Sequence, residues 1–377
     1  MLSTGETPVP LASRNHAWPL VRRANPRSVM PSADLGYRLL AARYLRKQAK
    51  RLAAQLDGAR RGDNPECVHQ ARVASRRLRA GLRMFRECFD AKRWKTWRKQ
   101  IRRVTAKLGD ARDKDVQIAY LCDVLDALDE KACYPGIARL LVRLERQRER
   151  IQPEVVEAVD RLQSSGVLEQ MLAVSKEALS EARSQAAGVP SACGLAEPQR
   201  HILDNLDRLL SCQDSLSDPE DRERHHAMRI AAKRLRYTLE ISAPVYGGQL
   251  DETVEAVKKV QTLLGEVHDC DVWAEHLRAF AAKERKRIMR HYGHAGPFAR
   301  LEVGIEHLHQ QGHRRRQQVF QELVDYWQQL DGRREWENLA ETIRRPGRQA
   351  VLLGSPLGTS CPGDGAARRK VISDGTH

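Results

Sequence analysis

The sequence predicts an all-α fold, and three observations lead to that prediction. Apolar residues recur at helical spacing through most of the 377 residues. Runs of alternating Val, Ile, Thr and Tyr between turn dipeptides, which are typical of strands, are missing. A short charged motif, which has helical spacing of its own, occurs twice in the chain. We therefore expect two helical-bundle halves that are related by an internal repeat.

The expected helices follow from apolar stripes taken in chain order. The first stripe runs from Leu39 to Leu56, with an apolar residue every three or four positions. Further stripes lie over 69–85, 94–108, 137–144, 226–239, 250–264 and 305–330. Clusters of Gly and Pro separate them at 58–65, 134–136, 188–198, 217–219, 247–248 and 293–297. The longest of these clusters, 188–198, divides the helical region into two comparable halves.

These breaks predict five segments. A flexible leader over 1–31 is rich in Pro and has no periodic apolar pattern. A first half over 32–188 and a second half over 199–330 flank a linker over 189–198. A C-terminal extension over 331–377 ends in a stretch rich in Gly and Pro, which predicts a disordered tail.

The charge balance predicts acidic partners. The chain has 65 Lys and Arg against 49 Asp and Glu, a formal net charge of +16, which favours nucleic acid, an anionic membrane surface or polymeric phosphate. The aromatic content of 5% is low for a protein that stacks on single-stranded bases. The eight Cys form no CxxC pair, so we expect reduced thiols. Since no apolar run is long enough for a signal peptide or membrane span, we expect a cytoplasmic protein without a membrane partner.

Two motifs make up the repeat. The pattern H-x-x-R-[VI]-A-x-[KR]-R-L-R stands at 69–79 and again at 226–236. About thirty residues later, the pattern LG-[DE]-x-x-D-x-D-V stands at 108–116 and at 264–272. The two offsets, 157 and 156 residues, are nearly equal. Such a recurrence of two motifs in the same order indicates an internal duplication.

The first motif places its basic residues on one face of a helix. His69, Arg72, Arg76, Arg79 and Arg83 fall within about 80° of one another at 100° per residue. The second copy repeats this face with His226, Arg229, Lys233 and Arg236, and has Glu240 where the first copy has Arg83. Because like charges at such spacing repel, an external polyanion is the simplest compensation. Arginine suits phosphate, with which it pairs in a bidentate manner, and a bound anion would favour protonated histidine.

The next helix of each half adds basic residues. Arg102 and Arg103 lie beside its apolar stripe in the first half, and Lys258 and Lys259 align with them in the second. The LG element that follows is interpreted mainly as helix punctuation. Gly109 and Gly265 would end one helix, and Asp113 and Asp269 would cap the next. A second hypothesis is that Asp115 or Asp271 braces neighbouring arginines.

On these twin motifs the chain resembles the CHAD domain family over roughly residues 34–330. The resemblance implies two helical bundles related by pseudo-twofold symmetry, whose basic helices line a shared central cavity or channel. It further implies binding of inorganic polyphosphate and targeting to polyphosphate granules, without catalysis and without a cofactor. The ligand-facing residues that it implies are His69, Arg72, Arg76, Arg79, Arg102, His226, Arg229, Lys233, Arg236 and Lys258. The chain departs from the pattern at His268, where the first half has Arg112.

Two other functions remain open at this stage. The same arginines would meet nucleic acid, although no helix-turn-helix, zinc-finger or RRM signature is visible. A phosphate-handling or metal-dependent hydrolase is the second alternative, but the chain has no P-loop and no HExxH. His309 and His313 stand at metal-binding spacing without an evident third ligand, and His225 points away from His226. We therefore expect neither a metal site nor an enzyme.

Overall fold

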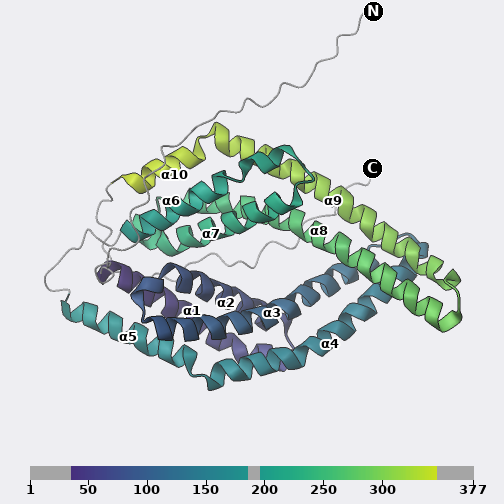
Figure 1. The fold of residues 1–377 in the computed structure, drawn as a ribbon, viewed down its shortest axis with the longest axis horizontal. Helices are drawn as coiled ribbons and strands as arrows, with labels where there is room; N and C mark the ends of the chain where they lie inside the picture. The colour runs from purple at the N-terminus through teal and green to yellow at the C-terminus, as the bar shows by residue number, and fades with distance from the viewer. Residues whose placement is uncertain (1–34, 186–195, 346–377) are drawn as a thin grey trace, which may run out of the picture. The chain divides into compact units, whose positions relative to one another are not determined.

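The computed structural model describes residues 35–185 and 196–345, and every regular element in these two ranges is a helix (Figure 1). The prediction of an all-α fold is thus confirmed. The expected leader over 1–31, most of the expected linker and the tail beyond residue 345 lie outside the described residues.

Ten α-helices make up the described chain. Those before residue 186 are α1 (Leu35–Arg61), α2 (Pro65–Met84), α3 (Ala91–Asp126), α4 (Tyr134–Ser164) and α5 (Val167–Gln185). Those after residue 195 are α6 (Ala196–Leu210), α7 (Arg222–Tyr246), α8 (Asp251–Tyr292), α9 (Ala299–Gly332) and α10 (Glu335–Arg344). None of the described helices is long and apolar enough to cross a membrane.

The two helices that carry the first motif, α2 and α7, begin in the same way. The side chain of Asn64 accepts a hydrogen bond from the backbone N–H of Glu66 at 2.8 Å, and Pro65 occupies the first turn of α2. The side chain of Asp221 accepts from the backbone N–H of Arg224 at 3.1 Å at the start of α7. Such caps satisfy backbone N–H groups that lack partners within the helix. They fix where each motif histidine enters its helix.

The LG element does not end a helix in either half. Gly109 lies inside the 36-residue α3, and Gly265 lies inside the 42-residue α8. The prediction that these glycines end a helix, and that Asp113 and Asp269 cap the next, is therefore wrong. A glycine in a helix costs only about 1 kcal/mol, and apolar burial on both sides of it outweighs that cost. The buried residues are Leu108 and Ala111 in α3, and Leu264 and Val267 in α8.

The hydrophobic core joins the two halves of the sequence. One cluster is built from α1 to α5 alone. A second cluster is formed mainly by α6 to α10, but Tyr37 and Leu40 of α1 and Phe85 after α2 are buried in it. A third cluster combines the last part of α3 and the first part of α4 with α8 and α9. The described helices accordingly belong to one compact unit.

A buried carboxylate also connects the halves. Glu284 of α8 has a fully buried side chain, and its oxygens accept hydrogen bonds from Nε of Arg139 at 2.9 Å and of Arg143 at 3.0 Å, both on α4. Arg287, one turn further along α8, also pairs with it. A buried charge is stable only when it is paired and hydrogen-bonded in this way. The cluster therefore holds α4 and α8 in one relative position.

Candidate functional site

The basic faces of the two repeated helices meet in the structure. Helices α2 and α7 are in contact and run beside each other (Figure 1). The clearest sign is Lys233 of α7, whose pKa is lowered from 10.5 to about 7. Burial is the main cause, and the positive charges of Arg76, Arg229, Arg72 and Arg79 add to it. The ammonium group of α7 thus lies among guanidinium groups of α2.

The same crowding extends along α2 and onto α3. Partial burial lowers the pKa of Arg79, and the charges of Arg102 and Arg98 on α3 lower it further. Partial burial also lowers the pKa of Arg83, followed by the charge of Arg234 on α7. The cations therefore form a continuous series from the contact between α2 and α7 to the exposed side of α3.

Most of these cations have no carboxylate partner. Among the described residues, no Asp or Glu oxygen lies within 4.0 Å of the charged groups of Arg76, Arg79, Arg83, Arg102, Arg103, Arg229 and Lys233. The buried Nε atoms of Arg76 and Arg229 also lack a hydrogen-bond acceptor. We call these seven residues the unpaired cluster. Arg72 differs, because its Nη2 lies 3.2 Å from Oδ1 of the exposed Asp113. An unpaired cluster of this kind costs free energy of folding, which a bound anion would offset.

A shallow, open pocket lies along α3 at the end of this series. Its volume is about 370 Å³, and its lining is Lys95, Arg98, Lys99, Arg102, Arg103 and Ala106. Arg98 also stacks on the ring of Trp94, with 5.2 Å from Cζ to the ring centroid. The sequence-predicted set includes Arg102 and Arg103 but not the other three cations. Those three were missed because the prediction required repetition, and α8 has no matching basic residues there.

Three predicted residues of the second half have partners of their own. Nε of Arg236 lies 2.7 Å from Oε1 of Glu240, and Oε2 of the same carboxylate lies 3.7 Å from Nη2 of Arg77 on α2. Nζ of Lys258 lies 3.1 Å from Glu255. Nζ of Lys259 lies 3.9 Å from the centroid of the Tyr326 ring on α9. The second half therefore has fewer unpaired cations than its sequence suggests. It contributes Arg229 and Lys233 to the unpaired cluster.

Each motif histidine lies beside the fifth residue of its LG element. Burial lowers the pKa of His69, and the neighbouring charge of Arg112 on α3 lowers it further. The Nδ1 atoms of His226 and His268 lie 3.4 Å apart, and the ring centroids 4.6 Å apart. Burial and the charge of Arg229 lower the pKa of His268. Both pairs are half-buried near the start of the basic faces, where a bound anion would favour protonation of His69 and His268.

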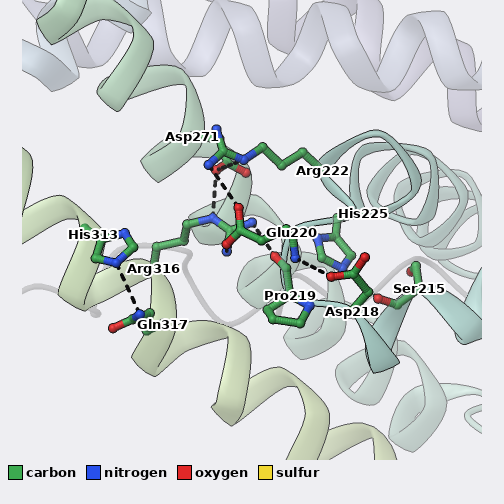
Figure 2. Close-up of polar contacts among 10 residues, drawn as sticks. All are labelled: Ser215, Asp218, Pro219, Glu220, Arg222, His225, Asp271, His313, Arg316 and Gln317. Carbon is green, nitrogen blue, oxygen red and sulfur yellow. Dashed lines mark hydrogen bonds and ion pairs between the residues drawn. The ribbon is translucent and has the colours of Figure 1, made fainter.

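The last aspartate of each LG element braces an arginine, as the second hypothesis predicted. Oδ1 of Asp271 accepts a hydrogen bond from Nε of the buried Arg316 on α9 at 2.7 Å, and lies 3.3 Å from Nε of Arg222 (Figure 2). Arg316 also donates to the backbone carbonyl of Pro219 at 2.8 Å. In the first half, Asp115 pairs with Arg148 of α4 at 2.6 Å. The braced arginines lie outside the first motif, and those of the second half anchor the turn that precedes α7.

His225 has a structural role beside the turn that precedes α7. Its ring is buried, with Nε2 at 2.9 Å from the carbonyl oxygen of Ser215 (Figure 2) and its centroid 4.9 Å from that of Phe320. It therefore points away from the basic face, in agreement with the helical spacing.

Replacing Asp271 with Ala is expected to destabilise the chain by about 3 kcal/mol, because the buried guanidinium of Arg316 loses its hydrogen-bonded carboxylate and, among the described residues, keeps only the carboxylate of the exposed Glu220 at 3.7 Å. Urea denaturation followed by circular dichroism measures this change. As a control, Asp160→Ala breaks a half-exposed pair with Arg60 and should leave the unfolding midpoint nearly unchanged. An Asp271 variant as stable as wild type would contradict the anchoring role.

The sequence is similar to those of two known proteins. Two uncharacterized proteins of Mycobacterium tuberculosis, from strains CDC 1551 / Oshkosh and ATCC 25618 / H37Rv, are each 30% identical over 222 residues. This region is 59% of the present chain and 42% of each relative, so the match spans less than half the length of these relatives.

Two solved structures share the fold. The crystal structure of the CHAD domain from the plant Ricinus communis has a TM-score of 0.51 at 20% identity, and covers 74% of this chain and 95% of that one. PptA from Streptomyces chartreusis has a TM-score of 0.53 at 18% identity, and covers 78% of this chain and 99% of its own. The sequence profile of the CHAD domain, whose family is associated in general with polyphosphate binding, matches residues 43–278, more than half of the sequence. The chain belongs to the CHAD domain family.

Proposed function

We propose that this protein binds inorganic polyphosphate without catalysing a reaction on it. The observation that carries the proposal is the unpaired cluster, in which α2 and α7 bring together cations that have no carboxylate oxygen within 4.0 Å among the described residues. An isolated chain gains nothing from such an arrangement, because the charges repel and are partly buried. A polymer of phosphate supplies many negative oxygens at short spacing, and arginine recognises such oxygens in a bidentate manner.

The path of the polymer follows the continuous series of cations. It would pass between α2 and α7, where Arg76, Arg229 and Lys233 converge, and continue past Arg79 to the α3 pocket. We propose that this path is the basic channel that the resemblance to the CHAD domain family implied. The pseudo-twofold arrangement remains part of the same proposal, with the first half contributing more free charge than the second.

A flexible single-stranded anion fits this path better than duplex DNA does. Facing helices give access to a thin chain from both sides, whereas a rigid duplex would reach one face at a time. Association with polyphosphate granules in the cytoplasm follows as the cellular role that we propose, since a non-catalytic binder would localise where its ligand accumulates.

Direct competition tests the function. Purified full-length chain is titrated with fluorescent long-chain polyphosphate in the presence of duplex DNA, at low and at near-physiological salt. We expect polyphosphate to displace DNA at both salts, with log affinity falling linearly as log salt rises. Equal or better competition by DNA would make the basic faces a nucleic-acid surface. Release of free phosphate during the same incubation would instead indicate a hydrolase.

A further inference from the structure

A group of metal-ligating side chains lies on elements other than those that carry the unpaired cluster. Glu130, Cys133 and His307 place a carboxylate oxygen, the sulfur and an imidazole nitrogen within 4.8 Å of one another. Glu130 and Cys133 stand at the short 3-10 turn η2 (Lys131–Cys133) before α4, and His307 lies on α9. No sequence pattern indicated this group, because Cys133 and His307 are separated by 174 positions (307 − 133).

Two glycines bring these elements together. A Cβ atom on Gly136 would lie 2.1 Å from the carbonyl oxygen of Leu301, and one on Gly304 would lie 2.0 Å from the carbonyl oxygen of Cys133. The backbones of η2, the start of α4 and α9 are therefore in direct contact, with no side chain between them. Cys133 is 1% exposed at this contact, so its sulfur is held in a fixed place at the edge of the third core cluster.

The three groups suit one class of cation. We propose that Glu130, Cys133 and His307 bind a zinc ion that joins η2 to α9. Sulfur, imidazole and carboxylate ligands are the set that Zn²⁺ takes in proteins, whereas Mg²⁺ and Ca²⁺ take oxygen ligands. Ligand atoms in a tetrahedral zinc site are about 3.3–3.6 Å apart, given bond lengths of about 2.0–2.3 Å. Since the ligand atoms lie within 4.8 Å of one another, each pair must approach by at most ~1.5 Å.

The side chains can supply that contraction. Glu130 is exposed, and its carboxylate already interacts with the Cys133 thiol, whose pKa is raised by burial and by Glu130. The half-buried His307 has no hydrogen-bond or ion-pair partner among the residues of 35–185 and 196–345. The buried sulfur would close the inner side of the site, and a water molecule would complete the coordination on the outer side, where Glu130 is exposed. The ion would cross-link segments from both halves of the sequence, independently of any binding at the basic faces.

Titration of the full-length chain tests the site. Protein stripped with a chelator, and kept free of polyphosphate, is titrated with Zn²⁺ by calorimetry and with Co²⁺ by absorption spectroscopy. We expect one tight zinc ion per chain, a thiolate-to-cobalt charge-transfer band, and an unfolding temperature several degrees higher with zinc. Cys133→Ser should remove the band and weaken zinc binding at least ~100-fold, more than the loss of an outer-shell partner.

Matched variants separate this site from other thiols and imidazoles. Cys270→Ser and His309→Ala should keep both the band and the affinity of wild type. Should Cys133→Ser lose helicity, His307→Gln provides the same test from the partly exposed side of the site. Absence of stoichiometric zinc binding by wild type, or a charge-transfer band that persists in folded Cys133→Ser or His307→Gln, would overturn the proposal.

Discussion

Replacing Arg72, Arg76, Arg229 and Lys233 together with Ala is expected to weaken polyphosphate binding by roughly 10³-fold or more at about 0.1 M salt. Each charge-assisted hydrogen bond to phosphate is worth about 1.5–3 kcal/mol, and three of the four cations have no carboxylate oxygen within 4.0 Å among the described residues. The slope of log affinity against log salt should also become less steep, because fewer counterions are released on binding. Fluorescence anisotropy at several salt concentrations measures both effects.

A charge-matched control makes the result specific. Arg60, Arg161, Arg200 and Arg315 each pair with a carboxylate away from the unpaired cluster. Their fourfold replacement with Ala removes the same formal charge, yet should change affinity by only a few-fold through the long-range field. Circular dichroism should show wild-type helix content for both variants. Equal losses in the two variants would mean that net charge, rather than the facing helices, governs binding.

Lys233 should make polyphosphate binding depend on pH. In the free chain its pKa is about 7, so the amine is largely neutral above that pH. A bound polyanion favours the ammonium form and raises the pKa again, so binding takes up a proton. Affinity should therefore fall by up to about tenfold per pH unit above 7 and level off below it. Titrations between pH 6.5 and 8.5 at constant ionic strength measure this dependence.

Two substitutions of Lys233 isolate its role. Lys233→Arg stays charged throughout, so affinity should become nearly flat above pH 7 and exceed that of wild type at pH 8.5. Lys233→Met should bind more weakly but unfold at a higher temperature, because it removes a buried charge among four arginines.

In the absence of polyphosphate, the free energy of unfolding should rise with pH, opposite to the affinity for polyphosphate. The folded state binds fewer protons than the unfolded state, so the Lys233 contribution to stability rises from about pH 7 toward the ordinary pKa of 10.5. A wild-type pH profile of binding that Lys233→Arg leaves unchanged would contradict this assignment.

Much of the site followed from the sequence, because a repeated motif on a helix determines which residues share a face. His69, Arg76 and Arg229 lie on the helices that the spacing predicted. The pattern did not reveal which cations are compensated. Lys259 and Tyr326 are 67 positions apart (326 − 259), and their contact depends on how α8 packs on α9. Tertiary partners of this kind have no local signature.

The error at the LG element has a different cause. Glycine and aspartate favour helix ends when nothing else acts on the backbone, but α3 and α8 are held along their whole length by neighbouring helices. The aspartates that were expected to cap helices instead lie on helical faces. Asp113 lies 3.2 Å from Arg72, and Asp269 interacts with the charge of Arg229. Packing energy distributed over two long helices overrode the local preference of a single residue.

The shared core has a consequence for synthesis on the ribosome. Tyr37 and Leu40 belong to a cluster with Ile202 and Leu206, and Ile202 is made 165 residues after Tyr37 (202 − 37). At a bacterial or eukaryotic elongation rate of about 5–20 residues per second, the first turns of α1 wait roughly ten to thirty seconds for their partners. During that interval the nascent chain exposes an apolar strip at its beginning. We therefore expect chaperones to bind the first half as it emerges from the ribosome.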